Sequence, residues 1–195
     1  EVLRNAIRRL AFDEFYNFLN DMNKLKVENI KLSNSHNIVQ GKAVAEFIER
    51  LPYKLTKGQA EAIDDILKDM GSDSVMNRLV QGDVGSGKTI VAMAALYACV
   101  KQGFQGALMV PTEVLAKQHF EALCEMLERQ GLLEQYQPVL LTGSLTAKEK
   151  RNCYEKIQSG VAKMIVGTHA LIQEQVVYDN LALVITDEQH RFGVK

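Results

Sequence analysis

The sequence predicts an α/β fold in which a parallel, doubly wound sheet carries helices on both faces. Four apolar runs, GALMV, PVLLT, KMIVG and LALVI, are continuous rather than alternating, as in strands that are buried on both faces. Segments with helical periodicity separate these runs, so strands and helices alternate along the chain. The 195 residues, 47% of them apolar, are enough to bury a full core.

The N-terminal part is expected to be a helical extension. Apolar side chains recur every three or four residues through residues 1–30, which predicts one long amphipathic helix. The polar stretch at 31–42 is typical of a linker, and a short helix is expected at 43–50. The predicted units are therefore residues 1–50 and residues 51–195.

From residue 56 onward, helices and strands are expected to alternate. Thr56 and Thr146 mark two helix starts, because Gln59 and Glu149 follow them at the spacing of a capping box. The expected helices cover 57–70, 88–102, 113–129, 147–158 and 169–174. The expected strands cover 78–81, 106–110, 138–142, 163–166 and 181–186.

The composition does not point to a nucleic-acid partner or a membrane. The net charge is −1, so any contact with DNA or RNA is expected to be local. The apolar run at 90–100 is too short to cross a bilayer and the N-terminus lacks a signal-peptide layout, which predicts a cytoplasmic protein. The three cysteines are widely spaced, as is typical of reduced thiols. The chain begins with Glu1 and ends just beyond a charged cluster, which indicates a fragment of a longer protein.

The segment GDVGSGKT at 82–89 fits the phosphate-loop pattern G-x-x-x-x-G-K-[ST], after an apolar strand and at a helix start. Its glycines let successive backbone N–H groups point at phosphate oxygens, and the helix adds its positive N-terminal end. Lys88 would reach the β and γ phosphates of a nucleoside triphosphate, and the Thr89 hydroxyl would ligate Mg²⁺. The alternative is a glycine-rich turn with an incidental lysine. The residues predicted to bind the nucleotide are Gly82, Asp83, Val84, Gly85, Ser86, Gly87, Lys88 and Thr89.

A second acidic centre follows the last predicted strand, in LALVITDEQH at 181–190. Asp187 is predicted to hold Mg²⁺, directly or through water, and Glu188 to orient or deprotonate the attacking water. Thr186 stands where an aliphatic residue is usual, but it is β-branched and suits a strand. The alternative is a solvated acidic turn. The predicted catalytic residues are Lys88, Asp187 and Glu188, and the predicted metal ligands are Thr89 and Asp187.

The order of motifs resembles the first motor domain of superfamily 2 helicases. The motifs are LTKGQ at 55–59, GDVGSGKT at 82–89, PTEVLAKQH at 111–119, LLTGS at 140–144, GTHALI at 167–172 and DEQHRFGV at 187–194. The last is the most specific, and the set resembles the RecG family of bacterial branch-migrating DNA helicases. Transcription-repair coupling factors have a similar motor but DEEQRFGV at this place, so Gln189 followed by His190 favours the RecG family. The resemblance covers roughly residues 51–195.

This resemblance implies a RecA-like phosphate-loop domain that uses ATP and Mg²⁺ to move on duplex or branched DNA and to remodel stalled forks and Holliday junctions in repair and recombination. It implies that Gln59 reads adenine, with Tyr53 or Leu51 against the ring. It also implies that His190 couples the ATP site to a second motor domain. Each role has a plainer alternative, because Gln59 has capping-box spacing to Thr56 and His190 fits an ordinary polar position at a helix start.

Three loops are predicted to hold the DNA backbone. PTE, TGS and GTH each stand where a strand ends and a helix begins, so N–H groups and hydroxyls can hold phosphates without reading base sequence. The alternative is that Thr112 and Thr168 are simply helix N-caps. The predicted contacts are Thr112, Glu113, Thr142, Gly143, Ser144, Thr168 and His169. His119 lies on an apolar helix face and KEKRNCYEK is typical of a solvated helix face, so neither is predicted to be a site.

The resemblance also implies partners in a longer chain. In this family ATP lies between two RecA-like domains, the second of which supplies an arginine finger, and a wedge domain splits the DNA branch. Alone, the present chain is expected to bind Mg-ATP weakly and to hydrolyse it slowly or not at all. The strand after DEQH normally lies between the DEQH strand and the phosphate-loop strand, so these two are not expected to be hydrogen-bonded directly. The alternative from another class is a nucleotide-gated binding module without motor output.

Overall fold

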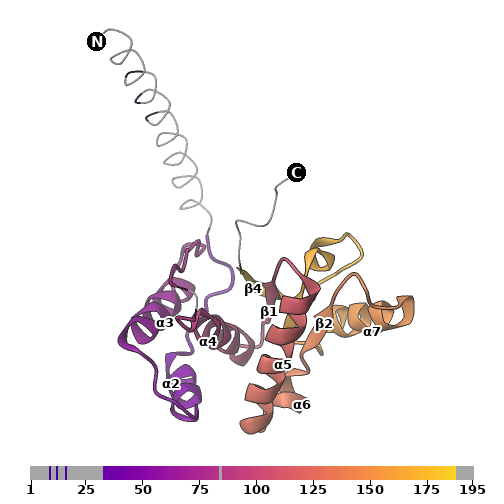
Figure 1. Ribbon diagram of the computed structural model, residues 1–195, viewed down its shortest axis with the longest axis horizontal. Helices are drawn as coiled ribbons and strands as arrows, with labels where there is room; N and C mark the ends of the chain where they lie inside the picture. The colour runs from indigo at the N-terminus through magenta and orange to yellow at the C-terminus, as the bar shows by residue number, and fades with distance from the viewer. Residues whose placement is uncertain (1–8, 10–11, 13–15, 17–32, 84, 188–195) are drawn as a thin grey trace.

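The computed structural model describes residues 33–83 and 85–187, together with Arg9, Phe12 and Tyr16. The helix predicted over 1–30 otherwise lies outside the described residues. The helices are α2 (Gly41–Glu49), α3 (Lys57–Met70), α4 (Lys88–Lys101), α5 (Glu113–Arg129), α6 (Leu133–Tyr136) and α7 (Ala147–Gln158), with a 3₁₀ turn η1 (His169–Ile172). The strands are β1 (Gln105–Met109), β2 (Val139–Leu141), β3 (Met164–Gly167) and β4 (Leu181–Thr186). They form one parallel sheet in the order β2-β3-β1-β4, which confirms the predicted fold class (Figure 1).

Helices cover both faces of this sheet. Leu108 of β1 and Met164 of β3 belong to the larger core, which includes residues of α4 and α5. Their strand neighbours Ala107 and Ile165 point the other way and belong to a second core with residues of α7 and η1. Burial on both faces explains why the apolar runs of these strands are continuous.

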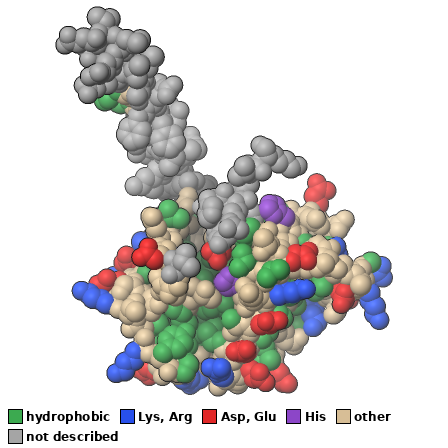
Figure 2. All heavy atoms as spheres, in the orientation of Figure 1, with side chains coloured by type: hydrophobic (Ala, Val, Ile, Leu, Met, Phe, Trp, Pro, Cys, Tyr) green, Lys and Arg blue, Asp and Glu red, His purple; other side chains and the backbone are tan. Residues whose placement is uncertain are grey.

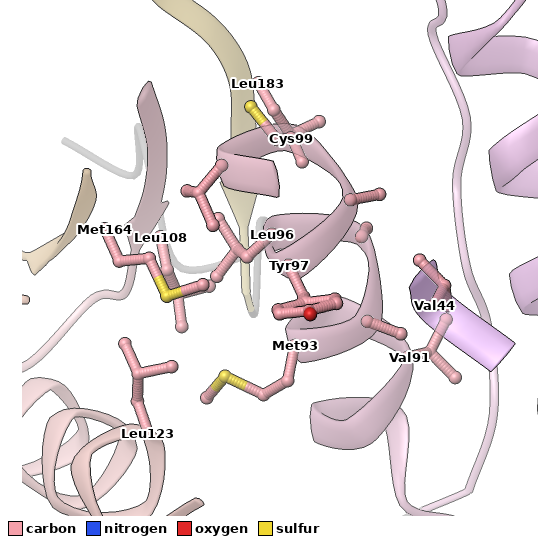
Figure 3. Close-up of a cluster of buried hydrophobic side chains, with 14 of the residues drawn as sticks. Val44, Val91, Met93, Leu96, Tyr97, Cys99, Leu108, Leu123, Met164 and Leu183 are labelled. Atoms are coloured by element: carbon pink, nitrogen blue, oxygen red, sulfur yellow. The ribbon is translucent and has the colours of Figure 1, made fainter. Parts of the chain in front are cut away.

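Helix α4, which follows the phosphate loop, is the centre of the larger core. Ten of its 14 residues are buried, and a helix that is apolar on all sides is stable only when other elements surround it. Its Leu96 lies beside Leu108 and Met164 of the sheet, and Val91 faces Val44 of α2 (Figure 3). The helix that carries Lys88 is therefore held firmly from several sides.

The packed unit begins before the predicted boundary at residue 50. Phe47 of α2 stacks on Tyr97 of α4, with 4.5 Å between the ring centroids. Ile38 is buried in the same core, and the Asn34 side-chain amide donates to two backbone carbonyls at the end of α3. From residue 33 onward, the stretch predicted to be a linker is thus packed against α3 and α4. Asn34 bonds to carbonyls at the end of α3, and Ile38 is buried in the core.

The strand predicted at 78–81 is not formed. This segment is irregular, and Leu79 is 79% exposed. A strand needs a neighbour for its backbone N–H and C=O groups, and within the described part of the chain this segment pairs with none. A cavity of about 1240 Å³ separates it from β4, which is the edge strand on that side. The arrangement agrees with the prediction that the phosphate-loop segment and the DEQH strand are not hydrogen-bonded directly.

Two smaller elements differ from the prediction. The short α6 was not predicted, and the helix expected at 169–174 is the 3₁₀ turn η1. Both have only four residues, too few for helical periodicity to reveal α6 or to distinguish an α-helix from a 3₁₀ turn at η1.

Cys99, Cys124 and Cys153 are free thiols, as predicted, and burial raises the pKa of Cys99 to about 12. Across the described residues, no helix combines the length and the apolar character needed to cross a membrane.

Candidate nucleotide and DNA site

Glycines form the bends of the phosphate loop. Gly85 and Gly87 have φ angles of 80° and 78°, in the left-handed region that side chains disfavour. Gly87 is also the N-cap of α4, where a Cβ would collide with the side-chain amide of Gln59. No side chain among the described residues caps α4, so its first turn presents backbone N–H groups toward the loop.

Lys88 places its charge over the same loop. Its Nζ donates to the carbonyl oxygens of Gly82, at 2.8 Å, and Asp83, at 2.9 Å. The ammonium group therefore lies beside the positive N-terminal end of α4. Together, the glycine bends, the helix end and the lysine fit a polyphosphate anion.

Gln59 takes part in the capping box and also reaches the phosphate loop. Its Oε1 accepts from Thr56 N at 2.9 Å, and its own backbone N donates to Thr56 Oγ1 at 3.3 Å. Its Nε2 donates to Ser86 O at 2.8 Å, which ties α3 to the loop. A cavity of about 320 Å³ lies beside this amide, and among its lining residues are Leu51, Tyr53, Gln59, Gly87 and Thr89. The residues predicted to contact adenine therefore surround one cavity.

Asp187 stands at the end of β4, next to the phosphate loop. Its backbone N donates to Met109 O at 2.9 Å, which fixes the residue against β1. Asp187 lines the cavity of about 1240 Å³ together with Lys88 and Thr89, so the structure brings these predicted catalytic and metal residues to one space. Glu188 and His190 lie outside the described residues, as does Val84.

The oxygen donors at this cavity fit Mg²⁺. Thr89 and Asp187 supply a hydroxyl and a carboxylate, which are hard ligands of the kind that Mg²⁺ prefers. Within the described residues there is no cluster of three or more His, Cys, Asp or Glu side chains that would hold a metal alone. That donor set is typical of a magnesium ion whose coordination is completed by phosphate oxygens and water.

His119 belongs to this site although the sequence did not predict it. Its Nε2 lies 3.3 Å from Asp187 Oδ2, and its side chain is only 15% exposed. A signal was available, because His119 shares the buried face of α5 with Ala116, Leu123 and Leu127. A polar ring on a buried helix face requires a partner.

The three predicted DNA loops lie at the same edge of the sheet as Asp187. They follow β1, β2 and β3, whose carboxyl ends meet at this edge because the sheet is parallel. Thr112 Oγ1 accepts from Leu115 N at 3.3 Å, so its hydroxyl is an N-cap, as the alternative interpretation predicted. Thr168 makes no such cap within the described part of the chain, and its N donates to Leu141 O at 3.3 Å. His169 follows as the first residue of η1.

Glu113 joins two of these loops. Its Oε1 accepts from Ser144 N at 2.9 Å, and hydrogen bonds from Ser144 hold the pKa of Glu113 below its usual value. The TGS loop is tied further by Lys150 Nζ, which donates to Gly143 O at 2.7 Å, and by the hydrogen bond of 3.2 Å between the hydroxyls of Thr142 and Ser144. A carboxylate facing a DNA phosphate would repel it, so this geometry favours a bracing role for Glu113 over direct contact.

The charged side chains do not form a basic patch on the visible face. Lys and Arg side chains are interspersed with Asp and Glu side chains there (Figure 2). This distribution matches the net charge of −1. Any hold on a DNA backbone at this face would therefore rely on loop N–H groups and hydroxyls more than on side-chain charge.

A glycine-rich loop opening a buried helix, with an aspartate at the end of a parallel strand beside it, defines a phosphate-loop NTPase domain of the RecA-like kind. The family model for DEAD/DEAH box helicases matches residues 56–195. The chain belongs to this family.

Within the family, the relatives resemble the chain over nearly all of its length. It is 50% identical to the ATP-dependent DNA helicase RecG of Streptococcus pneumoniae and 48% identical to that of Aquifex aeolicus, over 98% and 96% of the chain. The chain spans 28% and 23% of these relatives, or about a quarter of their length. These similarities confirm the resemblance to the RecG family.

Solved structures of helicases are similar to this chain in fold. A structure of RecG bound to a three-way DNA junction is 41% identical, with a TM-score of 0.80, and covers 96% of this chain and 25% of that one. The DEAD-box helicase Mss116 bound to single-stranded RNA is 22% identical, with a TM-score of 0.55 over 69% of this chain and 27% of that one, and supports the fold alone.

Proposed function

We propose that this chain is the first RecA-like motor domain of an ATP-dependent DNA helicase that moves on duplex DNA and remodels branched DNA. The observation that carries the proposal is that the phosphate loop and the three loops proposed to hold the DNA backbone lie along one edge of the sheet. Family membership supports the motor, and the 41% identity to a protein solved on a three-way junction supports the branched substrate.

ATP and Mg²⁺ are the proposed cofactors. The first turn of α4 and the Lys88 ammonium would hold the β and γ phosphates, and Gln59 would meet the base in the smaller cavity. Thr89 and Asp187 would hold Mg²⁺, which when bound neutralises phosphate charge. Glu188 remains the proposed residue for orienting the attacking water. His190 remains the proposed link to a second motor domain.

The proposed DNA contacts are sequence-independent. Because the hydroxyl of Thr112 caps α5, the PTE loop would offer its N–H groups to a phosphate. In the TGS loop, Glu113 and Lys150 hold the backbone in place, which would preset its N–H groups and hydroxyls. Thr168 and His169 would supply the third loop. Such contacts position a strand without reading bases, as translocation along any sequence requires.

The test is ATP hydrolysis by the intact protein on single strands, linear duplex and a three-way or four-way branch of equal length. We expect the strongest stimulation with the branch. Equal stimulation by linear duplex would limit the proposal to a general duplex translocase. Stimulation by none of the three would contradict a DNA motor, and stimulation by RNA polymerase instead would indicate a transcription-repair coupling factor.

A further inference from the structure

His119 and Asp187 meet although 68 positions separate them along the chain. The imidazole Nε2 lies 3.3 Å from the carboxylate Oδ2, with the ring 15% and the aspartate side chain 36% exposed. Both residues line the cavity that Lys88 and Thr89 also line. The histidine therefore contacts the proposed metal ligand at the mouth of the phosphate site.

A role in packing alone does not account for this geometry. A histidine serving only as filler on the buried face of α5 could direct ring carbons at any neighbour, whereas here a ring nitrogen meets a carboxylate oxygen. Polar side chains in contact with a metal-ligating carboxylate help to fix its orientation and commonly affect metal affinity. The contact uses Oδ2 of Asp187. Mg²⁺ is commonly bound through one or two carboxylates together with phosphate oxygens and water.

Helix α5 also connects this contact to the DNA loops. Thr112 caps the helix in the PTE loop, and His119 lies seven residues further on, about 10 Å along the helix axis. Leu123 and Leu127, both fully buried, hold the remainder of the helix against the core. A displacement of the helix start by a bound phosphate backbone would therefore move the His119 ring relative to Asp187.

We infer that His119 is a positioning residue, which orients Asp187 for Mg²⁺ and transmits DNA binding at the start of α5 to the metal site. The inference rests on the proposed function and adds a residue that links the proposed metal site to the proposed DNA loops. His119 contacts neither nucleotide nor DNA in this role. It acts through the carboxylate of Asp187.

Two substitutions separate this role from packing. His119→Leu keeps an apolar side chain of similar bulk and removes the N–H group. His119→Gln keeps an N–H donor at about the reach of Nε2. Glu121→Gln, an exposed position on the same helix, is the matched control. The thermal midpoint of each intact variant, measured without metal, reports its folding.

The main measurement is Mn²⁺ binding by electron paramagnetic resonance, with a non-hydrolysable ATP analogue, in the absence and presence of saturating duplex DNA. We expect His119→Leu to weaken Mn²⁺ binding about tenfold and to abolish the effect of DNA on it. His119→Gln should recover most of both, and Glu121→Gln should match the wild type.

Three outcomes would overturn the inference. In the first, His119→Leu binds Mn²⁺ as tightly as the wild type with the same response to DNA. In the second, both His119 variants lose affinity equally and show the same lowered thermal midpoint, which means that the ring only packs. In the third, the wild type binds no Mn²⁺ with the analogue, which contradicts the proposed function itself and is thereby distinguishable from a failure of His119 alone.

Discussion

The β1–β3 part of the sheet and the side formed by β4 and the phosphate loop differ in burial. Ile165 and Val166 of β3 are fully buried between two layers of helices. On the other side, Val184 of β4 is 56% exposed and Leu79, before the loop, is 79% exposed. The β1–β3 part, called the packed half below, is buried like a protein interior. The side formed by β4 and the phosphate loop, called the open half, places polar side chains around a cavity.

The difference in burial indicates that one half contributes mainly to stability and the other mainly to ligand binding. In the packed half, side chains contribute free energy of folding through burial and satisfied hydrogen bonds. In the open half, Lys88 and Asp187 face a cavity and contribute little to packing. Substitutions in the packed half should therefore change stability, and substitutions in the open half should change ligand binding.

The largest effect is expected in the packed half, from Gln105→Leu. Gln105 is fully buried, and its Nε2 donates to the carbonyls of Ile157 and Ala162. Its Oε1 accepts from the N–H groups of Asp179 and Asn180. Leucine would leave four backbone groups without this partner, so the free energy of unfolding should fall by roughly 4 kcal/mol, about 1 kcal/mol per group. Urea unfolding of the chain would measure it.

Gln102→Leu is the matched control for Gln105→Leu, because Gln102 is exposed three residues away. We expect it to change stability by less than about 0.5 kcal/mol. If the two variants lost equal free energy of unfolding, the buried Gln105 amide would not be what stabilises the packing of β1 against its neighbouring loops.

A somewhat smaller loss is expected from Phe47→Ala, which tests whether α2 belongs to the packed half. The ring is 1% exposed and stacks on Tyr97 of α4. Its removal should lower the free energy of unfolding by roughly 3 kcal/mol through lost burial and a cavity. Phe47→Leu, which refills most of the space, should cost clearly less in the same urea titration. A loss below about 1 kcal/mol for alanine would place α2 outside the core.

Lys88→Ala should show the opposite behaviour, because Lys88 belongs to the open half. Its ammonium group donates to the loop carbonyls of Gly82 and Asp83, and the residue is not part of the hydrophobic core. We expect ATP turnover by the intact protein to fall by about 100-fold or more, with stability changed by less than about 0.5 kcal/mol. Lys101→Ala, at the other end of α4, is the control and should retain activity. Unchanged affinity for ATP would remove the phosphate-loop assignment.

The sequence predicted the packed half better than the open half. Continuous apolar runs and capping boxes at Thr56 and Thr146 located the buried strands and two helix starts, because burial and capping leave local patterns. The segment at 78–81 has the composition of a strand, but a strand also needs a neighbour, which no local pattern reveals. The packing of 33–49 against α4 was missed for the same reason, since it depends on contacts distant in sequence.

In the candidate site, too, residues with local sequence signals were predicted and contacts between distant residues were missed. The phosphate-loop motif located Lys88 and Thr89, and the end of a buried strand located Asp187, because each is marked by its own neighbours in the sequence. His119 was assigned to the core because its helix face is apolar, and its partner Asp187, just after β4, is distant in sequence. Glu113 was predicted to touch DNA, whereas its carboxylate is engaged with Ser144. Motifs therefore indicated the candidate residues and loops, and only the fold indicated which atoms meet.

The smallest effect is expected from Glu113→Ala, which acts on the loops that follow β1 and β2. Removing the carboxylate frees the TGS loop from the start of α5, so affinity of the intact protein for duplex DNA should fall by about threefold, the size of one ordinary hydrogen bond. If Glu113 instead faced DNA phosphate, its removal would strengthen binding. Glu121→Ala, which removes an exposed charge from the same helix, separates the brace from a change in net charge.

The effect of Glu113→Ala on DNA affinity should depend on pH. Hydrogen bonds from Ser144 lower the pKa of Glu113 in the folded protein, so the brace is complete above the ordinary pKa of a glutamate and weakens as the pH falls through the lowered value. Fluorescence anisotropy with labelled duplex should therefore show the wild type and Glu113→Ala converging at acidic pH. A constant ratio between the wild type and Glu113→Ala over this pH range would mean that the carboxylate does not preset the DNA loop.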